Sequence, residues 1–175
     1  MNLSAGDFFP PLIAKLKKKL ARKLLYGESY GLNQLDLKLI SAINAERKGY
    51  FVELGANDGV SQSNTYKLQK HFGWTGLLIE PSPRRFVECV ANRAFANRPE
   101  VRCAACVPFH FEDRFVEIED ADLMSVAKGL AVTDQQAVEH ADRGRRFLAD
   151  SALRYSYGAL ARTLTSLLDQ GRLKV

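Results

Sequence analysis

Polar and apolar residues form distinct patterns along this chain, and two short apolar runs near its middle predict strands. The runs cover residues 50–54 and 76–79, and each is too short for a helix and too apolar for a loop. Such runs are typical of buried parallel strands, whose carboxyl ends carry functional residues in α/β proteins. Glu53 and Glu80 stand at those ends, and Gly55 and Gly59 follow the first run, where the backbone must turn sharply.

Helical periodicity surrounds both runs. Apolar residues spaced three to four apart predict helices at residues 10–26, 34–46, 66–73 and after Pro83. Asn33 is expected to cap the second of these helices, and Gly73 is expected to end the third. Residues 50–80 therefore predict a strand–helix–strand unit of about 30 residues, the βαβ motif.

The second half of the chain has a weaker pattern. A third strand is predicted at residues 101–107, a strand or hairpin arm at 109–119, and a terminal helix within 151–169. Residues 121–150 are polar without clean periodicity, which indicates an insertion or lid. The whole pattern predicts an α/β fold with a mainly parallel sheet and flanking helices over residues 31–175, preceded by a basic amphipathic helix region at 1–30.

Composition and charge narrow the classes of function. A chain of 175 residues with 46% hydrophobic and 26% charged residues has the composition of a single globular domain rather than a disordered segment. The net charge of +5 comes largely from residues 15–23, which hold six of the 25 lysines and arginines. This local excess does not predict a nucleic-acid partner. It indicates either a solvated helix face or a peripheral contact of residues 11–25 with a membrane or a partner protein.

Cysteine content and hydropathy predict a cytoplasmic protein. Three cysteines are too few for a disulfide framework, and residues 1–9 lack the apolar core of a signal peptide. No uncharged apolar stretch reaches the roughly 20 residues that a membrane span needs. Cys103 and Cys106 form a C-x-x-C pair without a second pair, so buried thiols are favoured over a metal site. None of the three histidines has a context that indicates catalysis.

The loop E-L-G-A-N-D-G after the first strand distinguishes between two cofactors. The dinucleotide fingerprint needs glycine where Asn57 and Val60 stand, which disfavours an NAD-dependent oxidoreductase. The loop that binds S-adenosylmethionine needs an acidic residue followed by G-x-G-x-G or a near variant. Glu53, Gly55 and Gly59 fit that pattern, with Asn57 as the one substitution. Asparagine is among the non-glycine residues that adopt left-handed conformations.

The acidic residues of this region have predicted roles. Glu53 is expected to meet the cationic amino-acid part of S-adenosylmethionine, through water or backbone. Glu80 is expected to accept hydrogen bonds from two ribose hydroxyls, because a carboxylate has two acceptor oxygens. The catalytic base stays unassigned, since Asp58 and Asp113 are both candidates and the sequence does not choose between them. Trp74 is expected in the core rather than stacked on adenine.

Several segments together resemble the FkbM family of methyltransferases. They are Y-F-V-E-L-G-A-N-D-G-V at 50–60, S-N-T-Y at 63–66, G-W-T-G-L-L-I-E-P-S-P at 73–83 and N-R at 92–93, with N-Q-L-D-L at 33–37 upstream. The resemblance implies a class I, Rossmann-like methyltransferase fold, S-adenosylmethionine as cofactor, and O-methylation of a hydroxyl on a sugar or natural product. The loop and the resemblance together give the expected cofactor-binding residues, which are Glu53, Gly55, Ala56, Asn57, Asp58, Gly59, Asn64, Glu80 and Pro81.

The chain also departs from the family's pattern. Family members continue past a T-L-x-x-L-L-like helix, here residues 163–168, into a strand with an acidic D-x-E-G segment, whereas this sequence ends at Val175. The prediction is therefore a complete cofactor site in a sheet that is truncated at its C-terminus. The alternative is a catalytically incomplete cofactor-binding or interaction module that uses its basic helix at a membrane or protein partner.

Overall fold

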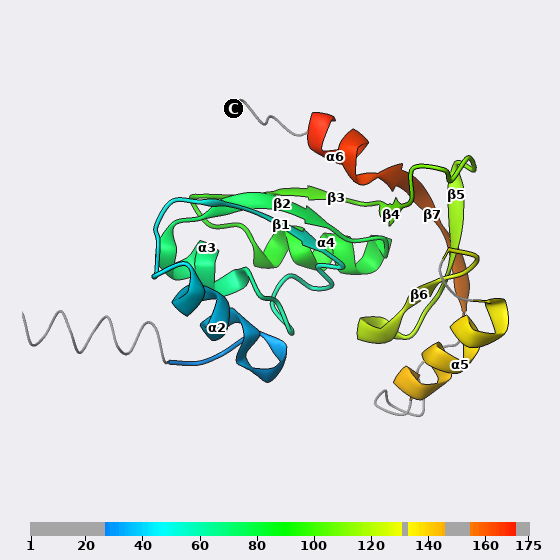
Figure 1. Cartoon of the computed structure of the whole chain (residues 1–175), viewed down its shortest axis with the longest axis horizontal. Coiled ribbons are helices and arrows are strands. Elements are labelled where there is room, and N and C mark those ends of the chain that lie inside the picture. The colour runs from blue at the N-terminus through cyan, green and yellow to red at the C-terminus, as the bar shows by residue number, and fades with distance from the viewer. Residues whose placement is uncertain (1–26, 131–132, 146–154, 171–175) are drawn as a thin grey trace, which may run out of the picture.

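A computed structural model describes residues 27–130, 133–145 and 155–170, which form an α/β arrangement with two sheets (Figure 1). The basic helix predicted at residues 10–26, with its expected contact surface at 11–25, lies outside the described residues. In chain order, the described elements are η1 Leu32–Gln34, α2 Leu35–Ala42, β1 Tyr50–Leu54, α3 Tyr66–Phe72, β2 Thr75–Ile79, α4 Pro83–Asn92, β3 Glu100–Arg102, β4 Ala105–Val107, β5 Phe115–Glu119, η2 Asp122–Met124, β6 Val126–Ala127, α5 Asp134–Arg145, β7 Ser156–Thr163 and α6 Leu164–Gln170.

The first sheet confirms the predicted strand–helix–strand unit. β1, β2 and β3 are parallel and adjacent in that order, with Val52 opposite Leu77 and Leu54 opposite Ile79. Between β1 and β2 the chain forms α3, which ends at Gly73 as predicted, with φ of 72°. Glycine is favoured at this position because it adopts the left-handed conformation without steric cost.

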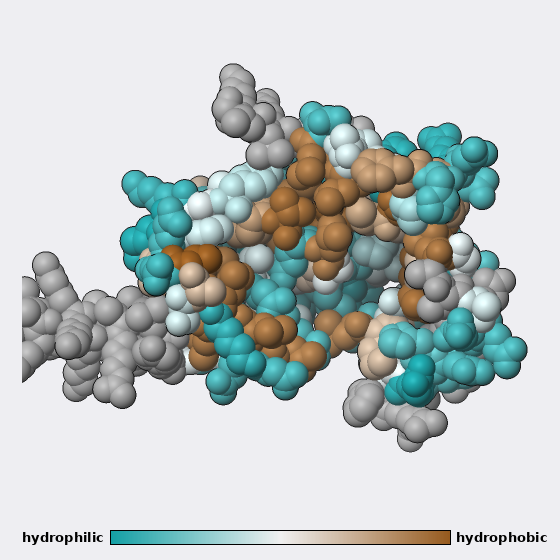
Figure 2. Space-filling model, viewed as in Figure 1, coloured by the Kyte–Doolittle hydropathy of each residue, from teal (hydrophilic) through white to brown (hydrophobic). Residues whose placement is uncertain are grey.

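Helices cover both faces of the first sheet. Phe51 and Leu78 pack against Cys89 of α4 on one face, and Leu77 and Ile79 pack against Leu167 of α6 on the other. In Figure 1, α6 lies above the sheet, while α3 and α4 lie below it. Figure 2 shows that hydrophobic surface continues from α6 over the adjoining part of the sheet.

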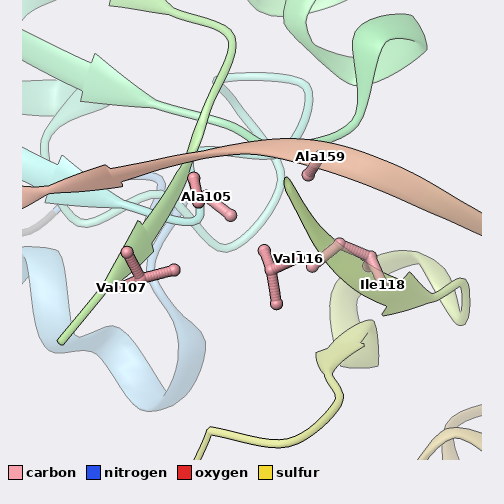
Figure 3. Close-up of a cluster of buried hydrophobic side chains, with 6 residues drawn as sticks. Ala105, Val107, Val116, Ile118 and Ala159 are labelled. Atoms are coloured by element: carbon pink, nitrogen blue, oxygen red, sulfur yellow. The ribbon is translucent and has the colours of Figure 1, made fainter. Parts of the chain in front are cut away.

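The second sheet is mixed and has the strand order β4-β7-β5-β6. β7 pairs parallel with β4 and antiparallel with β5, and β5 pairs antiparallel with β6. Its buried core contains Ala105, Val107, Val116, Ile118, Ala159 and Ala161 (Figure 3). The α/β class and a parallel sheet with flanking helices are confirmed, but four of the seven described strands belong to this separate mixed sheet, which was not predicted. The Rossmann-like methyltransferase fold stays a prediction.

The strand predicted at residues 101–107 is interrupted. β3 ends at Arg102 and β4 begins at Ala105, and the two strands belong to different sheets. The Arg102 carbonyl accepts a hydrogen bond from Glu80 N–H at 3.0 Å, whereas Ala105 pairs with Ala161 of β7. Periodicity could not reveal the break, because each half is only three residues long and the pattern does not say which strand each half pairs with.

The helix predicted toward the end of residues 151–169 is confirmed as α6. Residues 156–163 before it form β7, the longest described strand, which the sequence analysis missed. Ala159 and Ala161 point into the second core. Because alanine has low β propensity and adds little to an apolar pattern, this alternation carried a weak signal.

The polar segment predicted as an insertion or lid has secondary structure of its own. It contains η2, β6 and α5, and β6 pairs with β5 through Ala127 and Ile118. In the arm predicted at 109–119, the strand β5 begins only at Phe115.

α2 is shorter than the helix predicted at 34–46 and begins differently. It ends at Ala42, and Asn44 beyond it has a left-handed φ of 49°. Asn33 does not cap the helix, because it adopts a φ of 52° inside η1. Asp36 accepts a hydrogen bond from Ser29 Oγ at 2.5 Å, so its carboxylate holds the preceding segment.

Two further predictions concern Trp74 and membranes. Trp74 packs against the core cluster that contains Phe51 and Leu78, as expected, and its Nε1–H donates to the Glu46 carbonyl at 2.8 Å.

Among the described residues, no helix has the length and apolar character that crossing a bilayer requires. The cytoplasmic location stays a prediction.

Candidate functional site

The candidate site lies at the carboxyl ends of β1 and β2, where the glycine loop (residues 55–59) meets residues 80–82. The N–H groups of Gly55 and Ala56 donate to the Ile79 carbonyl at 2.9 and 3.1 Å, so the loop starts against the end of β2. Gly55, Asn57 and Gly59 have φ angles of 68°, 48° and 81°. Asn57 therefore adopts the left-handed conformation that asparagine is expected to tolerate.

Glu80 is buried, and each of its carboxylate oxygens accepts one backbone hydrogen bond. Asn57 N–H donates to Oε2 at 2.7 Å, and Ser82 N–H donates to Oε1 at 2.8 Å. Burial raises the pKa of Glu80, and the two hydrogen bonds and the charge of Arg85 offset that effect only in part. Because a carboxylate oxygen can accept two hydrogen bonds, each Glu80 oxygen keeps an acceptor position for a further donor.

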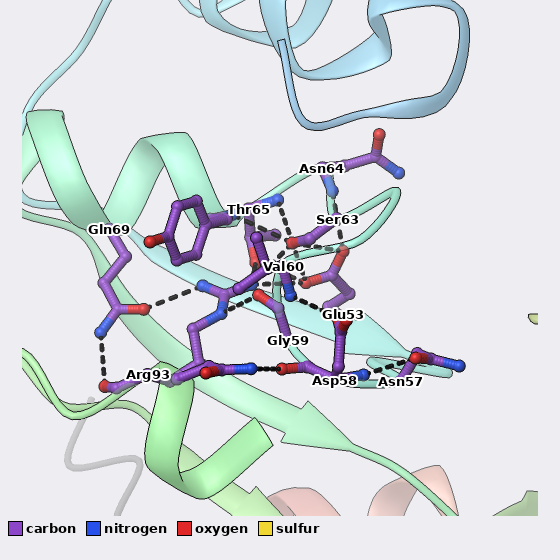
Figure 4. A network of polar contacts seen from close by, with 12 residues as sticks. Glu53, Asn57, Asp58, Gly59, Val60, Ser63, Asn64, Thr65, Gln69 and Arg93 are labelled. Carbon is purple, nitrogen blue, oxygen red and sulfur yellow. Dashed lines mark hydrogen bonds and ion pairs between the residues drawn. The ribbon is translucent and has the colours of Figure 1, made fainter. Parts of the chain in front are cut away.

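Glu53 points toward Ser63 and Asn64, in the segment that leads into α3 (Figure 4). Its Oε1 accepts a hydrogen bond from Asn64 N–H at 2.9 Å. Its Oε2 accepts from Thr65 Oγ1 at 2.5 Å and from Ser63 Oγ at 2.9 Å. The described geometry therefore gives Glu53 a structural role, and its expected contact with the cofactor stays a prediction.

Arg93, directly after α4, is the first of three site residues that the sequence analysis did not assign. It is fully buried, and its Nη2 lies 3.2 Å from Glu53 Oε2. Its Nε–H donates to the Gly59 carbonyl at 2.5 Å, and Nη1–H donates to Gln69 Oε1 at 2.8 Å. Arg93 therefore joins the last glycine of the loop to the end of β1 and to α3. The dipeptide N-R at 92–93 is visible in the sequence, but its spacing assigns it no partner.

Asp58, one candidate for the catalytic base, is occupied by its own loop. Its Oδ1 accepts from Val60 N–H at 2.8 Å and from Ser61 N–H at 2.7 Å. Burial acts to raise the pKa of Asp58, but the hydrogen bonds from Ser61 and Val60 and the charge of Arg85 lower it overall. A carboxylate of lowered pKa is a weak proton acceptor.

Asp113, the other candidate base, is exposed in the loop before β5. It lines a cavity of about 360 Å³ with Val107 and Arg162. Neither Glu80 nor a residue of the glycine loop lines that cavity. No described hydrogen bond or ion pair joins Asp113 to the glycine loop, and the base stays unassigned.

Asp122 brings the second sheet to the glycine loop, a contact that the sequence analysis also missed. Asn57 Nδ2–H donates to Asp122 Oδ1 at 2.9 Å, and Arg85 Nη2 lies 2.6 Å from the same oxygen. Asp122 has a left-handed φ of 53° at the start of η2. Because the segment around it was read as an insertion or lid, no pattern in the sequence placed it beside Asn57.

The two loop glycines have different surroundings. A Cβ atom at Gly55 would meet no heavy atom within 4 Å, whereas one at Gly59 would lie 2.9 Å from Cys89 Sγ and 3.0 Å from Arg93 Cγ. Gly59 is therefore a packing glycine. Gly55 borders open space, which is the arrangement expected where a loop lies against a ligand.

The remaining predicted residues occupy the border of the site. Ala56 is buried in the cluster with Phe51, and the Pro81 carbonyl faces Cys103 Sγ at 3.9 Å. Asn64 donates its backbone N–H to Glu53, while its side-chain Oδ1 is buried with no hydrogen-bond partner among the described residues.

Tyr157 of β7 is a further residue near Glu80 that sequence reasoning missed. Burial and the charge of Glu80 raise the pKa of this tyrosine. β7 therefore places a phenol at the border between the second sheet and the site.

The cysteines form no common site. Cys103 lies in the connection between β3 and β4, Cys106 lies within β4, and both are free, as is Cys89. Among residues 27–130, 133–145 and 155–170, no three His, Cys, Asp or Glu side chains are grouped so that they could hold a metal ion.

Comparison with known proteins adds no assignment. No protein-family model matches this chain, and no curated protein matches it. The FkbM resemblance, the S-adenosylmethionine site and the methyltransferase activity stay predictions.

Proposed function

We propose that this chain binds S-adenosylmethionine and acts as a methyltransferase of FkbM type, with a hydroxyl of a sugar or natural product as acceptor. The observation that carries the proposal is the position of Glu80. It is a buried carboxylate at the carboxyl end of β2, held by Asn57 N–H of the glycine loop, with an acceptor position left on each oxygen. Two such positions suit the vicinal hydroxyls of a ribose.

The residues of the loop fit such a cofactor. The open space at Gly55 leaves room for a ligand to lie against the backbone at the carboxyl end of β1. The network of Arg93 and Glu53 holds the loop in its left-handed turns. When bound, the cofactor supplies a methyl group already activated on a sulfonium, so the protein has to bind, orient and exclude water.

The test is isothermal titration calorimetry of the whole chain with S-adenosylhomocysteine. We expect measurable binding, and we expect Glu80→Ala to weaken it at least about tenfold, because each hydrogen bond to a charged group contributes about 1.5–3 kcal/mol. Glu112→Ala removes an exposed carboxylate outside the site and should leave the affinity unchanged. A parallel titration with NADH should show no binding, because Asn57 and Val60 replace two glycines of the dinucleotide fingerprint.

Circular dichroism separates loss of binding from loss of fold. A folded chain that binds no S-adenosylhomocysteine would contradict the proposal. Binding that Glu80→Ala leaves intact would show that the ribose site lies elsewhere. If binding is confirmed, transfer of a labelled methyl group to sugar hydroxyls tests the activity.

A further inference from the structure

One edge of the first sheet is open. Within the described residues, β1 is the outer strand of the order β1-β2-β3, and no described strand pairs with its other side. The Gly49 carbonyl accepts from Thr75 N–H, and Gly55 N–H donates to the Ile79 carbonyl, so the odd-numbered residues of β1 face β2. Because this direction alternates along a strand, the N–H and C=O groups of Tyr50, Val52 and Leu54 face the open edge.

The side chains of the same three residues form an exposed apolar row. Tyr50 and Val52 are each 41% exposed, and Leu54 is 52% exposed. On β2, the residues opposite Val52 and Leu54 are Leu77 and Ile79, which are buried and pack against Leu167 of α6. The row is therefore a continuation of a buried face onto a strand that α6 does not cover, as the hydrophobic surface beside α6 in Figure 2 illustrates.

A cavity of about 410 Å³ follows the edge of β1. Leu39 of α2, Leu68 of α3 and Trp74 form apolar parts of its lining, and Glu53, Asn64 and Thr65 form polar parts. Leu39 is itself exposed. Natural edge strands are usually protected by a charged side chain, a proline or a bulge. The three outward-facing residues of β1 include none of these, so the edge has the features of a pairing surface.

Charge along β1 is distributed so that the strand complements itself. Arg47 and Lys48 are exposed just before its first residue. Half-buried Asp58 lies four positions beyond its last residue, and its pKa is lowered overall, because hydrogen bonds from Ser61 and Val60 outweigh the effect of burial. When two such strands pair antiparallel, the basic end of each lies beside the acidic end of the other. A parallel pair would place like charges together.

We propose that two copies of this chain associate by antiparallel pairing of β1 with β1 around a two-fold axis at Val52. In this register Val52 lies opposite Val52 of the second copy, and Tyr50 lies opposite Leu54, an aromatic–aliphatic pair that favours sheet pairing. The three outward-facing residues of one strand and the three of the other then form about six main-chain hydrogen bonds in total. The result is one continuous sheet across the dimer. This proposal is independent of the cofactor assignment.

Sedimentation equilibrium and light scattering of the whole chain test the interface. We expect the dimer to form by the time the protein concentration reaches about 100 µM. Val52→Lys places two lysines opposite each other at the axis and should raise the dimer dissociation constant at least about tenfold. Val87→Lys is the matched control, because Val87 lies on α4 and is 64% exposed. It should leave the dissociation constant unchanged.

A charge-swap experiment tests the register. Val52→Lys alone and Val52→Glu alone should each be monomeric, because like charges meet at the axis, whereas an equimolar mixture should form a heterodimer. A monomeric parent chain would overturn the proposal, as would a dimer that Val52→Lys does not weaken. Monomeric protein whose β1 amides are protected from hydrogen exchange would place another segment of the chain on this edge and would also overturn it.

Discussion

Arg93 and Glu53 form a buried ion pair beneath the glycine loop, and the pair explains how single residues hold this site. Arg93 donates to the Gly59 carbonyl as well as to Ser63 Oγ at 2.6 Å and Thr65 Oγ1 at 3.0 Å. Burying two charges is costly, and it is tolerated only when geometry and additional hydrogen bonds compensate. Here one guanidinium donates hydrogen bonds to acceptors in the loop, in the segment before α3 and in β1. Its planar fork can reach all of them at once, which the single ammonium group of a lysine could not do.

Removal of Arg93 should destabilise the fold strongly. We expect Arg93→Ala to lower the free energy of unfolding by about 3–5 kcal/mol, because Glu53 then stays buried without its cation. The free energy of unfolding of Arg93→Lys should lie between those of Arg93→Ala and the parent chain, since an ammonium cannot reach all the acceptors together. Urea denaturation measures both variants.

The control for Arg93 is Arg84→Ala. Arg84 has a side chain that is 71% exposed and pairs only at the surface of α4 with Glu88, so its removal should change the free energy of unfolding by no more than about 0.5 kcal/mol. Equal effects of Arg84→Ala and Arg93→Ala would refute the supporting role assigned to Arg93.

At the scale of elements, the glycine loop is where strand β1 is converted into a binding surface. Gly55 and Gly59 both adopt left-handed conformations, yet they meet different neighbours. The first borders open space and the second lies against Cys89 and Arg93. The loop therefore combines one glycine that a ligand needs with one that packing needs.

Alanine substitutions should distinguish the two glycines. Gly55→Ala should lower the free energy of unfolding by about 1–2 kcal/mol, the cost of a left-handed alanine. Gly59→Ala should lower the free energy of unfolding by about 1–3 kcal/mol more than Gly55→Ala does, because its Cβ atom would lie 2.9 Å from Cys89 Sγ. Gly129→Ala is the control, since its φ of 69° and empty surroundings match those of Gly55. If Gly59→Ala costs no more than these two in urea denaturation, the packing role of Gly59 is wrong.

For the whole molecule, two sheets are joined through α6 and through Asp122. α6 follows β7 of the second sheet and places Leu167 on Leu77 and Ile79 of the first. Asp122, from the second sheet's side, contacts Asn57 of the glycine loop. The candidate site is therefore built from both sheets, and its geometry depends on the contacts that hold them together.

The α6 contact should contribute substantially to stability. Leu167→Ala is expected to lower the free energy of unfolding by about 2–5 kcal/mol, because Leu167 is almost completely buried and its truncation leaves a cavity. Leu123→Ala, at an exposed leucine of η2, should change it by at most about 0.5 kcal/mol. Urea denaturation compares the two, and a Leu167→Ala variant as stable as Leu123→Ala would show that α6 does not anchor the sheets.

The sequence by itself determined the features that depend on neighbouring residues. It located β1 and β2, the end of α3 at Gly73 and the left-handed turns of the glycine loop, because apolar runs and the conformational freedom of glycine and asparagine act locally. It also placed Glu80 at a strand end, where the structure finds both oxygens held by backbone donors.

Only the tertiary structure decided which distant segments meet. Arg93 reaches Glu53 across 40 positions, and Asp122 reaches Asn57 across 65, and no local period encodes either contact. β7 lies between β4 and β5 through alanines that have no strong strand preference of their own. The break between β3 and β4 has the same cause, since a strand's sheet is set by the partner that buries it and completes its hydrogen bonds.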